Sequence, residues 1–236
     1  MMKLRIKFSK CGPMVFIGHL DMMRYFQKAM RRAEVDISYS SGFSPHQIMS
    51  FAAPLGVGIA SKGEYMDIGV DSLTSAAQVK DALNRVMVDG VKIESVKLLP
   101  DNTENAMSSV AAAKYTISFR ETYAPDFDLF GQIGDYLAQK EIRVTKETKK
   151  GSKEIDLKPH IYEFSFNNEK QEVSMLVDAS SSGNIKPVFV MEDYYRFCGR
   201  AAGEFDFIVT REDTFTNIGT DEKPDFVPLD YVGEDY

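Results

Sequence analysis

Basic side chains recur along one face of a predicted helix near the N-terminus. Residues 19–34 place apolar side chains at spacings of three and four, which is typical of an amphipathic helix. On another face of that helix lie four cations at positions i, i+4, i+7 and i+8: Arg24, Lys28, Arg31 and Arg32. Such a stripe can bind phosphate groups, and we predict an anion- or RNA-binding face. The alternative is a solvated helix surface.

His19 and Asp21 lie at the start of the same predicted helix. Imidazole titrates near neutral pH, so His19 is a candidate acid or base. Asp21 is a second catalytic candidate, although an acidic residue in the first turn also stabilises a helix through its dipole. The sequence therefore leaves both a chemical and a structural role open for this pair.

A loop rich in Ser, Gly and Pro follows the helix. Its hydroxyls and free backbone N–H groups suit contact with a phosphate or another polar ligand. The loop residues that we predict to contact an anion are Ser40, Gly42, Ser44, Pro45 and His46. His46 and His19 would together form an acid/base pair for RNA cleavage. The alternative for His46 is a surface histidine in a turn.

A third polar loop precedes a predicted helix at residues 188–197. Gly183, Asn184 and Lys186 are its candidate ligand-binding residues, because a helix N-terminus attracts phosphate. The glycine spacing matches neither the dinucleotide fingerprint nor the P-loop. The loop is therefore either part of a site or a structural turn.

Cysteine usage excludes several cofactor sites. An iron–sulfur cluster takes three or four cysteines, and the chain has two, Cys11 and Cys198. Neither a CxxC nor an HExxH zinc motif is present. A mixed metal site of Cys11, His19 and His46 remains an alternative. We expect this chain to bind no metal and no cofactor by itself.

Charge is distributed unevenly along the 236 residues. The net charge is −7, yet residues 1–35 contain eight basic and two acidic residues, and residues 201–236 contain two basic and ten acidic residues. An anionic partner would therefore meet one basic face. The chain starts with a charged segment and has no apolar run of membrane-spanning length, so we predict a cytoplasmic protein with no membrane partner.

Hydrophobic periodicity predicts an α+β fold. In the first half, predicted strands and helices alternate in the order β-α-β-β-α-β, which is the ferredoxin-like unit. Its helices are predicted at residues 19–34 and 75–88, and its strands at residues 4–8, 37–40 with a run to 53, 64–70 and 91–98.

The pattern restarts near residue 114. Strands are predicted at 114–119, 142–148, 162–166, 173–177 and 205–210, with helices at 127–138 and 188–197. We therefore predict two ferredoxin-like (βαββαβ) units in tandem, the second decorated with an extra β-hairpin. The predicted domains are residues 1–105 and 110–216, followed by an acidic, extended tail at 217–236.

The chain contains a series of short motifs spread over roughly residues 2–215. They are Phe8-Ser9-Lys10-x-Gly12, Gly18-His19-Leu20-Asp21-x-x-Arg24, Arg31-Arg32-Ala33, Tyr39-Ser40-x-Gly42-Phe43-Ser44-Pro45-His46, Ser50-Phe51-Ala52-x-Pro54-Leu55-x-x-Gly58, Glu64-Tyr65-x-Asp67, Asp156-Leu157-Lys158-Pro159-x-Ile161 and Gly183-Asn184-Ile185-Lys186-Pro187. Together they resemble the motifs of a bacterial family of radical SAM-associated (radical SAM-linked) proteins, a domain of unknown function.

This resemblance implies that the radical chemistry belongs to another chain. In many relatives the domain is fused behind a radical SAM domain, whereas this chain is similar to the stand-alone form. S-adenosylmethionine and an iron–sulfur cluster are therefore expected on a radical SAM partner protein and not here. The family brings no established reaction with it.

Three functions follow from these observations. The first is an accessory module that binds RNA (tRNA or rRNA) or another phosphorylated ligand for a radical SAM partner. The second is a His-based enzyme that cleaves RNA without a metal. The third is a subunit that uses the basic stripe only for protein interaction. The sequence leaves the oligomeric state open.

Overall fold

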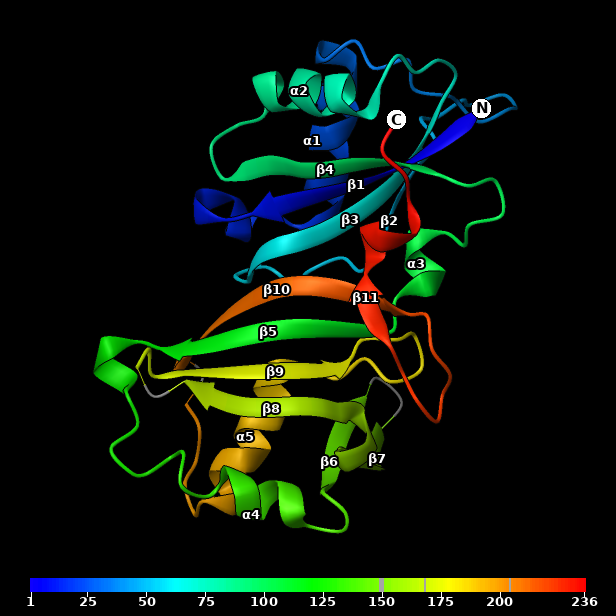
Figure 1. Ribbon diagram of the computed structural model, residues 1–236. Helices are drawn as coiled ribbons and strands as arrows, with labels where there is room; N and C mark the ends of the chain where they lie inside the picture. The colour runs from blue at the N-terminus through cyan, green and yellow to red at the C-terminus, as the bar shows by residue number, and fades with distance from the viewer. Residues whose placement is uncertain (149–150, 168, 204) are drawn as a thin grey trace. The chain divides into compact units, whose positions relative to one another are not determined.

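The chain has a mixed α+β fold (Figure 1). A computed structural model describes residues 1–148, 151–167, 169–203 and 205–236. The chain forms two compact units, one made of Met1–Ala111 with Arg211–Tyr236 and the other of Ala112–Thr210. Strand β10 (Phe207–Asn217) returns the chain from the second unit to the first.

The first unit contains an antiparallel sheet with the strand order β4-β1-β3-β10, and the short strand β2 also pairs with β3. Its leading elements run β1-α1-β2-β3-α2-β4, which is the predicted β-α-β-β-α-β order. Their bounds are β1 Met2–Lys10, η1 Gly12–Phe16, α1 His19–Arg32, β2 Met49–Phe51, β3 Ala60–Val70, α2 Ala76–Val86, β4 Val91–Leu99 and α3 Ala106–Ser109.

One face of this sheet packs against α1 and α2 (Figure 1). Alternate residues of β1, namely Leu4, Ile6 and Phe8, are buried there. From α1, Phe26 and Met30 enter the same apolar cluster. The period of two in the strand and of about 3.6 in the helix thus brings the two predicted apolar faces together.

The opposite face of the sheet is polar but buried. Arg5 has no exposed surface, and its guanidinium binds Asp67 at 2.8 Å. Lys7 pairs with Asp213 at 2.5 Å, and the hydroxyl of Tyr65 donates to Asp213 at 2.7 Å. Burial and the neighbouring carboxylates of Asp213 and Asp230 raise the pKa of Tyr65 far above its ordinary value, so this hydroxyl remains a donor.

The C-terminal segment folds onto this polar face. Strand β11 (Phe226–Pro228) pairs with β10, and the following η4 (Leu229–Val232) packs on β1 and β4. The carbonyl of Leu229 accepts a hydrogen bond from Arg5 at 2.9 Å, and the Leu229 side chain is completely buried. Residues 226–236, which the sequence predicts as part of an extended tail, thus contain a short strand and a 3-10 turn, and a buried leucine and backbone pairing hold them in place.

Further pairing extends to the last residues. Glu234 exchanges two backbone hydrogen bonds with Leu98 of β4, at 2.8 and 2.9 Å. Asp235 forms an ion pair with Lys97 at 2.7 Å. The acidic charge that the sequence places after residue 201 is thus partly matched with basic and polar groups of the first unit.

The second unit contains the antiparallel strands β5-β9-β8 and a separate pair, β6-β7. The rings of Tyr136 in α4 and Tyr194 in α5 pack edge to face, with their centroids 5.1 Å apart, and the ring of Phe164 in β8 contacts both. The bounds are β5 Ala112–Phe119, η2 Glu121–Tyr123, α4 Ile133–Ala138, β6 Arg143–Thr148, β7 Gly151–Asp156, η3 Lys158–His160, β8 Ile161–Asn167, β9 Glu172–Asp178 and α5 Pro187–Phe197.

Two predicted elements differ from the structure. The helix predicted at 127–138 begins at Ile133, because the carboxylate of Asp128 accepts from the N–H groups of Phe130 and Gly131 and holds a turn. The predicted strand at 37–40 is reduced to isolated bridges at Ile37 and Tyr39. No helix among the described residues is long and apolar enough to cross a membrane.

Candidate functional site

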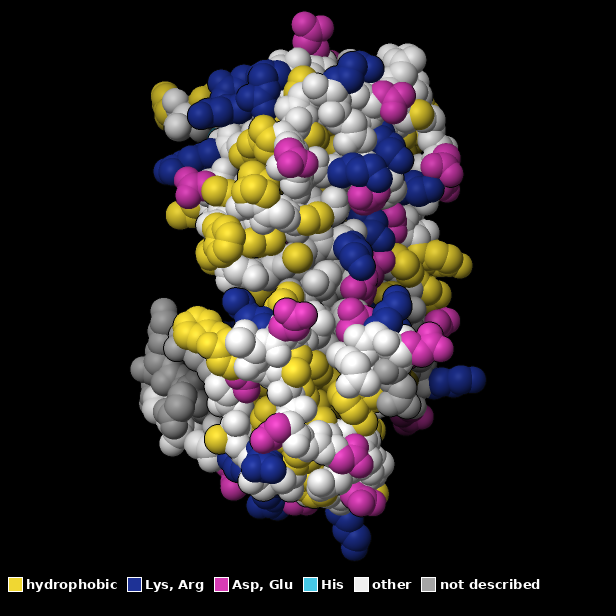
Figure 2. Space-filling model, turned by 90° about the vertical axis from the view of Figure 1, so that its left-hand side faces the viewer, with side chains coloured by type: hydrophobic (Ala, Val, Ile, Leu, Met, Phe, Trp, Pro, Cys, Tyr) yellow, Lys and Arg dark blue, Asp and Glu magenta, His cyan; other side chains and the backbone are white. Residues whose placement is uncertain are grey.

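The basic stripe of α1 is exposed in the first unit. The side chains of Arg24, Lys28, Arg31 and Arg32 lie on the helix surface that is turned away from the core. Lys and Arg side chains gather over α1 at the upper left of Figure 2. Arg24 forms an ion pair with Asp21 at 3.2 Å, and both side chains are about two-thirds exposed. Such an exposed pair contributes little to stability, so Arg24 can turn to a ligand at little cost.

Two other residues of the stripe, Arg31 and Arg32, form long hydrogen bonds to backbone carbonyls. Arg31 donates to the carbonyl of Gln27 at 3.2 Å, and Arg32 donates to the carbonyl of Val86 at 3.4 Å. Asp21 lies in the first turn of α1, where its negative charge interacts favourably with the positive end of the helix dipole. The geometry therefore assigns Asp21 a local partner in Arg24 and leaves the cations of the stripe accessible.

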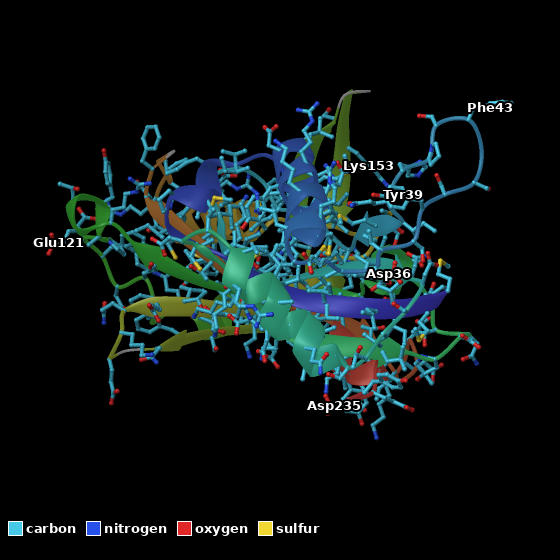
Figure 3. All side chains as sticks on the ribbon, turned by 90° about the horizontal axis from the view of Figure 1, so that it is seen from above. Asp36, Tyr39, Phe43, Glu121, Lys153 and Asp235 are labelled. Atoms are coloured by element: carbon cyan, nitrogen blue, oxygen red, sulfur yellow. The ribbon has the colours of Figure 1, made fainter. Side chains whose placement is uncertain are left out.

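The Ser/Gly/Pro/His loop is a hairpin that projects from the first unit. Ser40 and His46 close it: the Ser40 N–H donates to the His46 carbonyl at 2.8 Å, and Ser40 Oγ lies 2.8 Å from His46 Nδ1. Gly42 has φ +110°, a conformation that favours glycine. Phe43 is fully exposed at the tip, as Figure 3 shows. Ser44 and Pro45 are exposed as well.

Gln47 joins this hairpin to α1. Its side-chain amide donates to the Gln27 carbonyl at 3.3 Å and to the Tyr39 hydroxyl at 3.5 Å. Gln47 is only 6% exposed, whereas Tyr39 at the base of the hairpin is half exposed (Figure 3). The predicted loop residues and the helix that carries the basic stripe are thus held together by one buried side chain.

His19 lies elsewhere, at the first turn of α1. Its ring packs edge-on against Phe51 at 5.2 Å and lines a small cavity of about 20 Å³. His46 contacts Ser40 at the hairpin instead. Within the described part of the chain, no hydrogen bond or ring contact joins the two imidazoles. His46 thus lies in the hairpin, whereas His19 lines the small cavity.

Three charged residues beside this cavity were absent from the predicted site. Lys10 and Glu64 line it, and Arg211 of β10 binds Glu64 at 2.9 Å. Lys10 is 3% exposed and donates to the Ile17 carbonyl at 2.8 Å. Burial lowers the pKa of Lys10, nearby Arg211 lowers it further, and Glu64 opposes both effects.

A sequence signal exists for two of these residues. Lys10 continues the alternation of the buried β1 residues, and Glu64 continues that of Met66 and Ile68 in β3. A charged residue at an inward position of a strand indicates either a buried ion pair or a site. Arg211 has no such signal, since its partners come from residues more than 140 positions away.

The third predicted loop belongs to the second unit. Asp178 organises it: its carboxylate accepts from Ser180 N–H at 2.8 Å and bonds His160 Nδ1 at 2.8 Å. A side chain at Gly183 would meet that carboxylate, and Asn184 has φ +46°. Lys186 is exposed at the N-cap of α5. These contacts within the second unit account for the conformation of the loop and for its glycine.

A family model of uncharacterized proteins conserved in bacteria, DUF2344, matches residues 3–187. The chain therefore belongs to the DUF2344 family. No curated protein matches the chain. In the residues that the structure covers, no group of three or more His, Cys, Asp or Glu side chains is arranged to hold a metal ion.

Proposed function

We propose that this protein is an accessory RNA-binding module of the cytoplasm that presents tRNA, rRNA or another phosphorylated ligand to a radical SAM partner protein. The ligand would lie along the basic stripe of α1 and the hairpin of residues 40–46. S-adenosylmethionine and an iron–sulfur cluster would be bound by the partner. The resemblance of the sequence motifs to radical SAM-associated proteins supports that part of the proposal.

The main support for the proposal is that the base of the hairpin is bonded to α1, the helix that carries the four exposed cations. Gln47 fixes the hairpin to Gln27, which lies on α1 between Arg24 and Arg31. Phosphate groups would bind the cations, and unpaired bases would stack on the exposed rings of Tyr39 and Phe43. Cations beside exposed aromatic rings are typical of surfaces that bind single-stranded RNA.

The element order also supports a ferredoxin-like interpretation. The first unit has the order β-α-β-β-α-β, and its sheet runs β4-β1-β3 with β2 on β3. The second unit repeats strands and helices around β5-β9-β8, with β6-β7 as the additional hairpin. We interpret the chain as two such units in tandem; the proposed function rests on the site and not on this interpretation.

RNA affinity tests the proposal directly. Fluorescence anisotropy would measure the binding of labelled bulk tRNA and rRNA fragments across a series of salt concentrations. The double substitution Arg31→Ala and Arg32→Ala should weaken binding by about tenfold or more, equal to about 1.4 kcal/mol. It should also flatten the salt dependence by about one unit of slope for each phosphate contact that is lost.

A matched control uses two exposed lysines of the same unit. Lys62 and Lys92 each pair with one surface carboxylate, and their joint replacement by alanine removes the same number of positive charges. This control should bind RNA almost as the unchanged chain does. If both double variants lose the same affinity, the effect is net charge and the stripe is not the site. Stripe-dependent capture of the radical SAM partner without RNA binding would favour the protein-interaction role instead.

A further inference from the structure

Three large apolar side chains are exposed where η1 meets the first turn of α1. Phe16 of η1, Leu20 of α1 and Val57 of the loop after β2 are 71%, 62% and 61% exposed. Exposed apolar residues that are scattered singly need no explanation, whereas a contiguous group of them marks a surface that contacts another molecule. These three residues are called the apolar patch below.

Two contacts bring the segments of the apolar patch together. The Gly58 N–H donates to the Val15 carbonyl at 2.8 Å, so the loop after β2 is bonded to η1 within one residue of the patch on both sides. Pro54 of the same loop and His19 of α1 line one small cavity. The loop therefore contacts both η1 and the first turn of α1, and the patch is continuous across the three segments.

The backbone beneath the apolar patch is held at both ends of η1. The Cys11 N–H donates to the Gly90 carbonyl, and the buried ammonium of Lys10 donates to the Ile17 carbonyl, each at 2.8 Å. Met14 and Ile17 also pack against the core of the first unit. A surface that is already ordered loses little conformational entropy when a partner binds. The patch is thus prepared for docking.

Cations border the apolar patch. Arg24 and Lys28 follow Leu20 by four and eight residues, so the three side chains lie on the same side of α1. Both cations are exposed, and hydrophobic side chains lie beside Lys and Arg side chains on the first unit in Figure 2. An apolar centre with a positive border is complementary to a surface that has an apolar centre and a negative border.

We infer that the apolar patch docks a protein partner through an amphipathic helix, whose apolar side chains cover the patch and whose acidic side chains meet Arg24 and Lys28. Such a helix presents an apolar face with charged flanks. Leu20 and Val57 are aliphatic and offer no ring on which a base can stack, which favours a protein over RNA at this surface. The identity of the docked protein rests on the proposed function, in which a partner receives the RNA.

The RNA and the partner would use different ends of α1. Arg31 follows Leu20 by eleven residues, a rise of about 16 Å along the helix. Both ligands can therefore be bound at once, and their sites can be tested separately. Changes at Arg31 and Arg32 should weaken RNA binding, and changes in the apolar patch should weaken partner binding.

A synthetic helical peptide tests the docking surface. The peptide has leucines on one face and glutamates on both flanks, and a matched peptide has lysines in place of the glutamates. Anisotropy with the full chain should show a Kd below about 1 mM for the acidic peptide and at least about tenfold weaker binding of the basic one. Phe16→Ser combined with Leu20→Ser should weaken binding of the acidic peptide by about tenfold or more. Tyr231 and Ile218 are exposed in the same unit, and their joint replacement by serine is a matched control that should leave the affinity unchanged.

Three results would overturn the inference: no binding of the acidic peptide, equal binding of the two peptides, or equal losses in the patch variant and its control. Patch-dependent binding to vesicles that contain anionic lipid, without peptide binding, would assign the apolar patch to a membrane. The patch variant should bind RNA as the unchanged chain does, and a loss of RNA affinity would assign the patch to the RNA site. Patch-dependent peptide binding by a chain that binds no RNA would overturn the proposed function alone.

Discussion

Strand β1 and helix α1 carry similar numbers of basic residues but use them differently. In β1, Arg5 and Lys7 are paired with Asp67 and Asp213 on a buried face. In α1, the cations of the stripe are exposed, and Arg24 has the exposed partner Asp21. The positive charge of residues 1–35 is therefore divided: the strand cations help to hold the first unit together, and the helix cations are available to a ligand.

The largest effect should come from Arg5. Arg5→Ala would leave Asp67 without its ion pair and two carbonyls, those of Glu104 and Leu229, without their donor. Removal of one partner of a buried pair costs about 3–5 kcal/mol in the free energy of unfolding. Urea unfolding would measure this loss. A loss under about 1 kcal/mol would show that the strand cations are no more structural than those of the helix.

A somewhat smaller effect is expected at the C-terminal segment. Leu229 is completely buried, and a buried leucine replaced by alanine costs about 2–5 kcal/mol. Leu229→Ala should therefore destabilise the first unit, as urea unfolding would show. Exposed Ile218 in the preceding loop is a matched control, and Ile218→Ala should leave the free energy of unfolding nearly unchanged. Equal effects would contradict the packing of the segment onto β1 and β4.

Lys10 shares features with both the β1 cations and the α1 cations, because it belongs to β1 but lines a cavity at the start of α1. Its pKa is lowered from 10.5 in the folded state, mainly by burial, so the unfolded chain binds more protons as pH approaches 10.5. This residue should therefore make stability rise with pH in that window. Lys10→Met should remove the rise. Urea unfolding at several pH values above 7 would measure both slopes, and identical slopes would contradict the burial of the charge.

The smallest effect on stability is expected in the helix stripe. Arg24→Ala combined with Lys28→Ala should change the free energy of unfolding by about 0.5 kcal/mol or less, because both side chains are exposed. The same variant should bind RNA more weakly in the anisotropy assay. A large loss of stability would give the stripe a structural role and would weaken the contrast with β1.

Much of the fold could be predicted from periodicity. The apolar face of α1 and the alternation in β1 and β3 are local patterns, and their elements formed within a few residues of the predicted bounds. The tail could not be predicted in this way. Its acidic composition indicated an extended segment, but Leu229 and the pairing of Glu234 with Leu98 depend on surfaces that the fold creates.

The sequence by itself determined the basic stripe, because its spacing on one helix places the cations on one face whatever the rest of the chain does. It also indicated a loop or turn around residues 40–46, because glycine, proline and short polar residues favour one, and the structure closes this loop through Ser40 and His46. Only the tertiary structure decided which residue lies behind His19. Lys10, Glu64 and Arg211 come from three strands, and side chains so distant in sequence meet only when a sheet assembles.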